Sequence, residues 1–261
     1  MIPVALTIAG SDPSGGAGLQ ADLKTFHQHG VYGTSVVTLL TVQNTIAVEA
    51  VRVLDPDFVL SQLKAVISDI PPRAAKTGAL GNPEIIDALL MRVGSFDFPL
   101  VVDPVMISKH GTSLLDSDGT ELLKRRLLPF SYLVTPNIPE AIALSERQIT
   151  DVKSMETAAI TISKLGAKNV LIKGGHLQTE SACDVLYTEG NLHRLESPHI
   201  VTSHTHGTGC VLSAAITAHL ARGSAIGPAV KAAKGFISRA IESAPGLGKG
   251  HGPLNLFARS V

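Results

Sequence analysis

Short apolar runs alternate with longer stretches in which apolar and polar residues follow helical spacing. The runs are rich in Val, Ile, Leu and Thr, as buried strands are. They cover Val4–Ala9, Thr34–Val42, Ala47–Leu54, Ala74–Thr77, Leu100–Val102, Tyr132–Val134 and Val170–Ile172. Buried strands that alternate with helices predict an α/β fold with a mainly parallel sheet.

The helices between these strands are predicted from apolar spacing and from capping signals. Leu19, Leu23 and Phe26 share one helical face, and Gly30 after them is the expected C-cap of this helix. An Asx residue followed by proline, as at Asp55-Pro56 and Asn82-Pro83, predicts a helix start. The remaining predicted helices are Gly119 to Leu128, a helix capped by Ser154 that ends near Gly166, Gly209 to Ala221, and Gly227 to Glu242.

Two further runs, Val185–Thr188 and Leu192–Leu195, predict a hairpin around Glu189-Gly190-Asn191. Neither an internal repeat nor a long linker divides the sequence. We therefore expect one domain over residues 1–261, with a small β flap that includes the run from Ala47 to Leu54.

Composition narrows the class of protein. Lys plus Arg and Asp plus Glu both number 22, so the formal net charge is zero, and a nucleic-acid partner is not expected. The two cysteines, Cys183 and Cys210, lie far apart, which fits a reducing compartment. The first residues do not resemble a signal peptide, and no apolar run reaches the length of a membrane span. We expect a cytoplasmic protein without a membrane partner.

Chemistry-bearing residues follow several of the predicted strands. In open α/β sheets, ligands bind outside the carboxyl ends of the strands. Asp103 follows one buried strand and Glu140 comes shortly after the next. Such carboxylates hold Mg²⁺ through water in phosphoryl transfer, although either residue would also serve as a helix cap or a solvent-facing loop charge.

The segment from His204 to Cys210 runs directly into a predicted helix. Gly207, Thr208 and Gly209 precede that helix, and free N–H groups at a helix N-terminus form an anion site. The same position lowers the pKa of a thiol such as that of Cys210. In the alternative interpretation, the glycines only shape a turn and Cys210 is a small buried hydrophobe.

Two other interpretations of these glycines and histidines are weaker. A zinc site at His204, His206 and Cys210 lacks an evident fourth ligand. The string Gly16–Ala21 fits a dinucleotide-binding pattern, but no acidic residue ends the next strand. The P-loop pattern is absent from the sequence.

Taken together, the motifs resemble those of hydroxymethylpyrimidine/phosphomethylpyrimidine kinases over essentially the whole chain. The matching segments, in chain order, are Thr7–Lys24, Gln43-Asn44-Thr45, Asp103-Pro104-Val105-Met106, Thr135–Ala141, Lys173-Gly174-Gly175-His176, His206–Cys210 and Gly248–Asn255. The resemblance implies a ribokinase-like three-layer fold and two ATP-dependent, Mg²⁺-dependent steps of thiamin biosynthesis. The first step phosphorylates the pyrimidine alcohol, and the second converts its monophosphate to the pyrophosphate.

The resemblance also implies roles for individual residues. Gly207, Thr208 and Gly209 match the anion hole, and Cys210 stands where most members of the superfamily carry an aspartate base. The further matches are Gln43, Asp22, Gly10 and Val105 for substrate binding, Lys173 and Asn137 for ATP binding, and Glu140 and Asp103 for the metal. Small-molecule substrates are the expected partners, with a homodimer as the candidate assembly.

Two departures from the family pattern and two rival functions stay open. Gly78-Ala79-Leu80 stands where Gly-Met-Leu is common, so one pocket wall is smaller, and Asn255-Leu256-Phe257 replaces Asn-His-Phe. A pyridoxal kinase of the same fold is the near rival, because both substrates are six-membered rings with a hydroxymethyl arm. A non-catalytic ligand-binding regulator is the far rival.

Overall fold

The apolar runs form one nine-stranded sheet in the order β3-β2-β1-β4-β5-β6-β7-β8-β9. The computed structural model describes residues 2–107, 111–175 and 181–259. The six central strands β2, β1, β4, β5, β6 and β7 run parallel to one another. Strand β3 pairs antiparallel with β2 at one edge, and β8 and β9 add antiparallel pairs at the other. The strands span β1 Val4–Ser11, β2 Tyr32–Gln43, β3 Val48–Val53, β4 Ala74–Thr77, β5 Leu100–Val102, β6 Leu133–Val134, β7 Val170–Ile172, β8 Ser181–Thr188 and β9 Asn191–Pro198.

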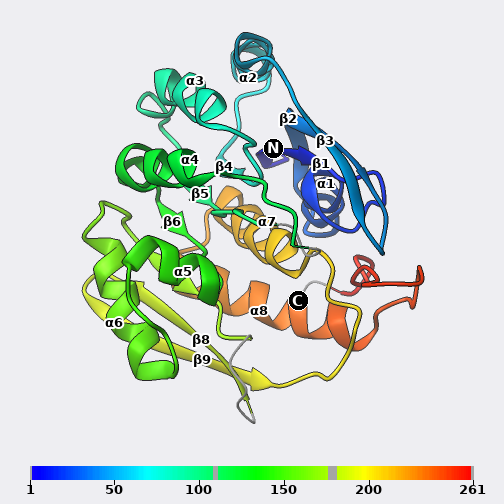
Figure 1. The fold of residues 1–261 in the computed structure, drawn as a ribbon, viewed down its shortest axis with the longest axis vertical. Coiled ribbons are helices and arrows are strands. Elements are labelled where there is room, and N and C mark those ends of the chain that lie inside the picture. Colours follow the sequence, from blue (N-terminus) through cyan, green and yellow to red (C-terminus); the bar gives the residue numbers. More distant parts are fainter. Residues whose placement is uncertain (1, 108–110, 176–180, 260–261) are drawn as a thin grey trace.

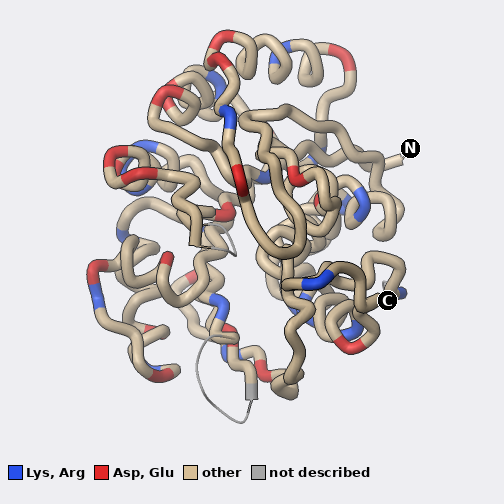
Figure 2. The backbone as a smooth tube through the Cα atoms, turned by 45° about the vertical axis from the view of Figure 1, so that its right-hand side comes forward, with Lys and Arg blue, Asp and Glu red and all other residues tan. Residues whose placement is uncertain are grey.

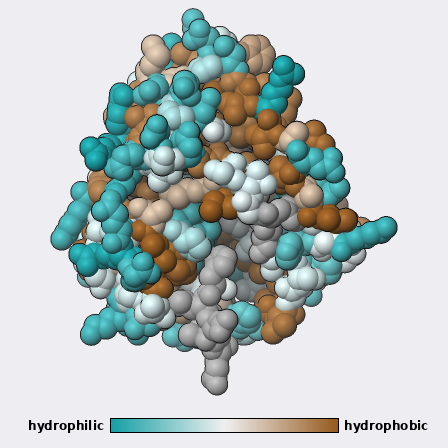
Figure 3. All heavy atoms as spheres, in the orientation of Figure 1, coloured by the Kyte–Doolittle hydropathy of each residue, from teal (hydrophilic) through white to brown (hydrophobic). Residues whose placement is uncertain are grey.

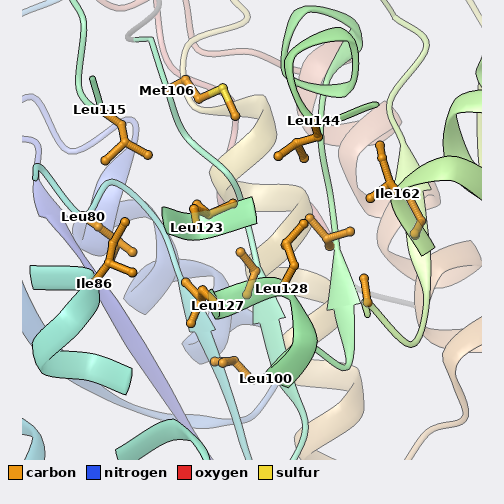
Figure 4. Close-up of a cluster of buried hydrophobic side chains, with 14 of the residues drawn as sticks. Leu80, Ile86, Leu100, Met106, Leu115, Leu123, Leu127, Leu128, Leu144 and Ile162 are labelled. Carbon is orange, nitrogen blue, oxygen red and sulfur yellow. The ribbon is translucent and has the colours of Figure 1, made fainter. Parts of the chain in front are cut away.

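Helices cover both faces of the sheet and give three layers (Figure 1). Their bounds are α1 Gly18–Gln28, α2 Pro56–Asp69, α3 Pro83–Val93, α4 Ser117–Leu122, α5 Ile138–Ser145, α6 Val152–Ser163, α7 Thr208–Ala221 and α8 Ile226–Glu242, with a π turn η1 Leu123–Leu127 and a 3₁₀ turn η2 Leu128–Phe130. Helices α1, α7 and α8 pack on one face. The other helices pack on the opposite face, where Leu80, Leu123 and Leu144 lie in the same cluster (Figure 4).

The cap signals explain most helix starts. Asp55 and Asn82 accept hydrogen bonds from the first turns of α2 and α3, and a proline follows each of them. Helix α6 differs from the prediction, because Asp151 is its cap and Ser154 completes a capping box. The predicted helix over 119–128 begins earlier, after Asp116, and changes to π and 3₁₀ geometry from Leu123 onward.

Helix α5 was not predicted, although its signal is present. Asn137 caps it, Pro139 lies in its first turn, and the Glu140 carboxylate accepts a hydrogen bond from the Asn137 N–H. This capping box lies directly after β6, so the segment expected to carry chemistry is also a helix start.

The predicted hairpin is confirmed as β8 and β9, joined by Glu189 and Gly190. Both residues have positive φ, 50° and 81°, as a two-residue turn between twisted strands requires. The predicted flap consists of β3 and the end of β2. The backbone positions of Lys and Arg and those of Asp and Glu are both distributed along the chain (Figure 2), in line with the zero net charge.

Candidate active site

The site lies where one face of the parallel strands changes from apolar to polar. Successive side chains of a strand point to opposite faces, so residues two apart share a face. The apolar row beneath α7 is Ala5, Ala74, Val101, Leu133 and Leu171. The residues two positions later are Thr7, Lys76, Asp103, Thr135 and Lys173. The carboxyl edge of the sheet thus carries one polar row under the first turns of α7.

One part of this row is a sealed ion pair. Lys76 Nζ lies 2.8 Å from Asp22 Oδ1 of α1, and both side chains are 0% exposed. Thr7 Oγ1 donates to the other Asp22 oxygen at 2.6 Å. Burial by itself lowers the pKa of Lys76, but the negative charge of Asp22 raises it above its ordinary value.

The other part is a second ion pair, which is open on one side. Lys173 Nζ lies 3.2 Å from Asp103 Oδ1, with side chains 14% and 2% exposed. Ser213 of α7 donates to Asp103 Oδ2 at 3.1 Å, and Thr135 Oγ1 lies 3.4 Å from Oδ1. Asp103 is therefore buried and bonded, which excludes the solvent-facing alternative.

Glu140 is buried beside this open pair. Burial raises the pKa of Glu140 to about 7. The positive charge of Lys173 lowers this pKa, and the negative charge of Asp103 raises it. Its Oε2 accepts from the Asn137 N–H at 2.8 Å, while Asn137 Oδ1 accepts from the Glu140 N–H at 2.9 Å. Both residues thus have a structural role as a helix cap, and no residue that the structure describes accepts a hydrogen bond from the Asn137 amide nitrogen.

The loop before α7 leaves two backbone donors open. Gly207 is the N-cap of α7 with φ of 79°, and a Cβ there would lie 1.9 Å from the Gly16 carbonyl oxygen. Thr208 turns its hydroxyl to the Thr205 carbonyl at 2.8 Å. Within the described ranges, neither the Gly209 N–H nor the Cys210 N–H donates a hydrogen bond to another residue. A free N-terminal turn of this kind binds an anion.

The state of the Cys210 thiol corrects one prediction. Burial raises its pKa to about 12; Lys76 lowers it, while Asp22 and Asp103 raise it further. The expectation that the helix N-terminus lowers the pKa of this thiol is therefore wrong, because burial raises the pKa by more than the nearby positive charge lowers it.

Gln43 lies at the end of β2, on the opposite side of the same loop. The Gln43 amide nitrogen is 3.4 Å from His206 Nε2, and His206 Nε2 is 2.8 Å from Asp12 Oδ2. Burial raises the pKa of Asp12, but the hydrogen bonds from His206 and Ser14 lower it to about 2 overall. Asp12 is ionised, so His206 Nε2 carries a proton and donates to it.

The other predicted substrate residues lie around the same edge. Gly10 is the penultimate residue of β1, and a Cβ there would lie 2.5 Å from Leu39 and 3.6 Å from Ala79. Val105 follows β5 and is half-buried. Asp22 has no exposed surface, so in this structure it contacts Lys76 and Thr7 rather than space open to a substrate. His176 lies outside the described residues.

Several site residues carried no sequence prediction. Lys76 is the clearest, and its signal was a lysine inside the buried run Ala74–Thr77, because lysine is seldom fully buried without a partner. Asp184 was also missed; it accepts from the Gly174 N–H at 2.9 Å and pairs with Lys234 of α8 at 2.7 Å. This contact fixes the backbone next to Lys173.

The structure also bears on the dinucleotide-binding and zinc-site interpretations of the glycines and histidines. A Cβ at Gly16 would lie 2.7 Å from the His206 ring, so the glycines of that string make room for protein rather than for a dinucleotide. Within the described part of the chain, no group of three or more His, Cys, Asp or Glu residues is placed to hold a metal. Nor does any described helix combine the length and apolar character needed to cross a membrane.

Comparison with known proteins identifies the family. The family model described as phosphomethylpyrimidine kinase matches residues 12–255. The chain is 48% identical over 251 residues to the thiamine biosynthesis bifunctional protein ThiED of Geobacter sulfurreducens, covering 96% of this chain and 51% of that protein. It is also 48% identical over 260 residues to the hydroxymethylpyrimidine/phosphomethylpyrimidine kinase of Haemophilus influenzae, covering 98% of this chain and 97% of that one.

A solved structure extends the comparison to the fold. The ADP complex of Bacillus subtilis pyridoxal kinase superposes with a TM-score of 0.91 at 39% identity, covering 99% of this chain and 98% of that one. The ribokinase-like three-layer fold expected from the sequence motifs is thereby confirmed. With a family model that spans nearly the whole sequence and relatives of this identity, the chain belongs to the phosphomethylpyrimidine kinase family.

Proposed function

We propose that this protein transfers the terminal phosphoryl group of ATP to the hydroxymethyl group of 4-amino-5-hydroxymethyl-2-methylpyrimidine, and then phosphorylates the monophosphate. The observation that carries the proposal is the open first turn of α7 facing the Lys173–Asp103 pair. It combines free N–H donors, an accessible ammonium group and buried carboxylates at one edge of the sheet. The family relationship supports the same reaction.

The phosphate-handling groups are Lys173 and the N–H groups of Gly209 and Cys210. A Cβ on Gly209 would lie 3.2 Å from Lys173 Nζ, so the ammonium group and the helix N-terminus lie close enough to bind the same phosphate. Positive groups fixed in this way stabilise the charge spread over the transferring phosphoryl group. Asn137 pairs with Lys173 in an isolated β-bridge, and its side-chain oxygen is used in the helix cap. Its amide nitrogen is proposed to donate a hydrogen bond to ATP.

Asp103 and Glu140 fit a magnesium ion bound together with ATP. Mg²⁺ in kinases is held by one or two carboxylates plus phosphates and water, and these are two buried carboxylates next to the phosphate-handling lysine. When bound, the ion neutralises phosphate charge. Glu140→Gln is an informative variant, because glutamine also completes a capping box and keeps helix α5 intact. We expect loss of most activity without loss of fold, as tested by assays with and without EDTA and by circular dichroism.

Cys210 acts in this proposal as a thiol that orients the substrate hydroxyl. Its pKa of about 12 leaves it protonated near neutral pH. Phosphoryl transfer has a loose transition state that requires little early proton removal. The hydroxyl proton therefore leaves late, and the sulfur fixes the geometry of the hydroxyl group.

Gln43 is proposed to recognise the aminopyrimidine ring by hydrogen bonding. A glutamine side chain offers one acceptor and two donors, which match a ring nitrogen beside an amino group. Thr41 Oγ1 donates to the Gln43 Oε1 at 3.3 Å, and the His206–Asp12 pair lies beside the amide nitrogen. Gly10, Val105 and the small side chain of Ala79 provide the walls around it.

Pyridoxal phosphorylation is the second candidate, favoured by the close superposition with a pyridoxal kinase and by the small wall at Ala79. The deciding experiment measures ATP consumption with the pyrimidine alcohol, its monophosphate and pyridoxal, in the wild type and in Gln43→Met. We expect the variant to lose about tenfold more activity on the pyrimidine than on pyridoxal, since unpaired polar groups are penalised. Equal losses would remove Gln43 from substrate discrimination.

The proposal also includes a cytoplasmic homodimer. Both cysteines are free, as in a reducing compartment. Leu40, Val42 and Ile46 of the β2–β3 hairpin are 46%, 56% and 59% exposed, and hydrophobic side chains gather over β2 and β3 (Figure 3). Light scattering of the wild type and of Val42→Lys tests the dimer; a wild-type monomer would contradict it.

A further inference from the structure

Lys76 stands out because it is a fully buried charged residue in the middle of the sheet. It belongs to β4, which pairs with β1 on one side and β5 on the other. Both Lys76 and its partner Asp22 are 0% exposed. A buried ion pair often contributes less stability than apolar side chains of the same size, so packing alone does not explain a lysine here.

The ammonium group lies directly beneath the anion loop. Lys76 Nζ is 3.5 Å from the carbonyl oxygen of Cys210, and Cys210 belongs to the first turn of α7. A helix N-terminus already carries positive partial charge. A cation at this position therefore raises the local positive potential further, at a cost to the folded protein that Asp22 partly offsets.

The ionisable groups around Lys76 come from three segments. Asp22 on α1 is the direct partner, Asp103 follows β5, and the Cys210 thiol, which is protonated near neutral pH, lies on α7. Lys76 is first among the groups that lower the pKa of Cys210, ahead of the opposing effects of Asp22 and Asp103. The sulfur of Cys210 therefore reports the potential that Lys76 produces.

Resting on the phosphoryl transfer proposed above, we propose that Lys76 is a positioning residue that acts through the anion loop. Its fixed charge, held by Asp22, stabilises negative charge at the Cys210 sulfur and at the substrate oxygen and phosphoryl group beside it. Lys76 has no exposed surface, so it acts through its field and not by contact with a substrate.

The test measures the alkylation rate of Cys210 by iodoacetamide between pH 7 and 10, with the product assigned to the Cys210 peptide by mass spectrometry. Lys76→Met removes the positive charge, and we expect alkylation about tenfold slower at a given pH, the change that one pKa unit produces. Asp22→Asn leaves the lysine uncompensated, and we expect alkylation about threefold faster, a shift of about half a pKa unit. A merely structural pair would give the same sign in both variants, because loosening the site exposes the thiol in each.

Two further variants keep the test decisive. Lys76→Met combined with Asp22→Leu removes both charges while filling the volume, so it protects the fold; we expect slower alkylation than in the wild type, but less slow than in Lys76→Met alone. Lys124→Met removes a lysine that is 11% exposed and pairs with the exposed Glu146, and should leave the rate unchanged.

Activity gives a second readout. We expect kcat to fall in Lys76→Met and in the double variant, with the KM for ATP within about twofold of the wild type, because Lys76 acts on the reacting charge. Shifts of equal sign in the two single variants, or an unchanged alkylation profile, would overturn the inference. A wild-type protein that phosphorylates none of the substrates would instead contradict the proposed function, and the alkylation result would still stand.

Discussion

The two ion pairs of the site occupy equivalent places on one face of the sheet, yet they differ in access. Lys76 comes two residues after Ala74 of β4, and Lys173 comes two residues after Leu171 of β7, in the same polar row and separated by β5 and β6. The Lys76–Asp22 pair is sealed, whereas the Lys173 side chain is 14% exposed. A sealed pair acts through its charge alone, while an open one can exchange its partner for a phosphate.

The covering elements produce this difference. Helix α1 brings Asp22 over Lys76, and Thr7 fills the remaining hydrogen bond of the carboxylate. Near Lys173, helix α7 carries Gly209, whose lack of a side chain leaves space, since a Cβ there would lie 3.2 Å from Lys173 Nζ. The same strand position thus becomes a buried charge or a ligand-binding group according to the size and polarity of the residue above it.

The largest expected effect comes from removing one half of the sealed pair. In Lys76→Met, Asp22 stays buried without its counter-charge, and we expect the free energy of unfolding to fall by about 3–5 kcal/mol. Urea denaturation followed by circular dichroism measures the loss. Most of it should be recovered in the double variant with Asp22→Leu; a loss of equal size there would show that packing, and not the unpaired charge, limits stability.

Removing the lysine of the open pair should affect activity instead. In Lys173→Met we expect kcat/KM for ATP to fall about 10²–10³-fold, or about 3–4 kcal/mol, because a fixed positive group no longer faces the phosphates. Steady-state kinetics measures this change. Lys168→Met, at an exposed lysine over the Tyr132 ring, is the matched control and should retain full activity.

A third buried ionisable group shows what happens without a counter-charge. His29 is 2% exposed, its Nδ1 bonds the Thr25 carbonyl at 2.8 Å, and no described residue pairs with its Nε2. Burial lowers its pKa to about 4 from the ordinary 6.5. The unfolded chain therefore binds a proton that the folded protein excludes, and stability present above pH 6.5 is lost as the pH falls towards 4.

We expect this loss to be about 3 kcal/mol for His29. Urea unfolding at a series of pH values measures it, in the wild type and in His29→Phe, whose ring keeps the packing against Phe236. The variant should show a shallower dependence between pH 6.5 and 4. His219, whose pKa burial also lowers, accounts for some of the remaining slope; an unaltered slope would assign the whole effect to other groups.

The smallest effect comes from partly closing the open pair. Gly209→Ala places a methyl group 3.2 Å from Lys173 Nζ, and we expect kcat/KM to fall about thirtyfold, or about 2 kcal/mol. Gly235→Ala, inside helix α8 with its nearest neighbour at 3.4 Å, is the matched control and should keep its activity. Equal kinetics in the two variants would show that Lys173 needs no open space above it.

The sequence predicted the order of strands and helices because local signals are strong here. Buried β-branched runs marked the strands, and Asp55 and Asn82 marked helix starts. Helix α5 was missed because the Asn137–Glu140 segment was interpreted as chemistry alone, although the same two side chains form a capping box. The irregular helix from Ser117 to Phe130 was predicted as continuous, since π and 3₁₀ turns depend on the packing of Leu123, Leu127 and Leu128 in the core.

The composition and motifs determined by themselves the α/β class, the location of chemistry at strand ends and the family resemblance. These depend on local spacing, which the chain carries in any conformation. The tertiary structure decided the pairing of Lys76 with Asp22, residues 54 positions apart, and the protonated state of Cys210. Both depend on desolvation and on charges from distant segments, and burial of that kind exists only once α1 and α7 close over the sheet.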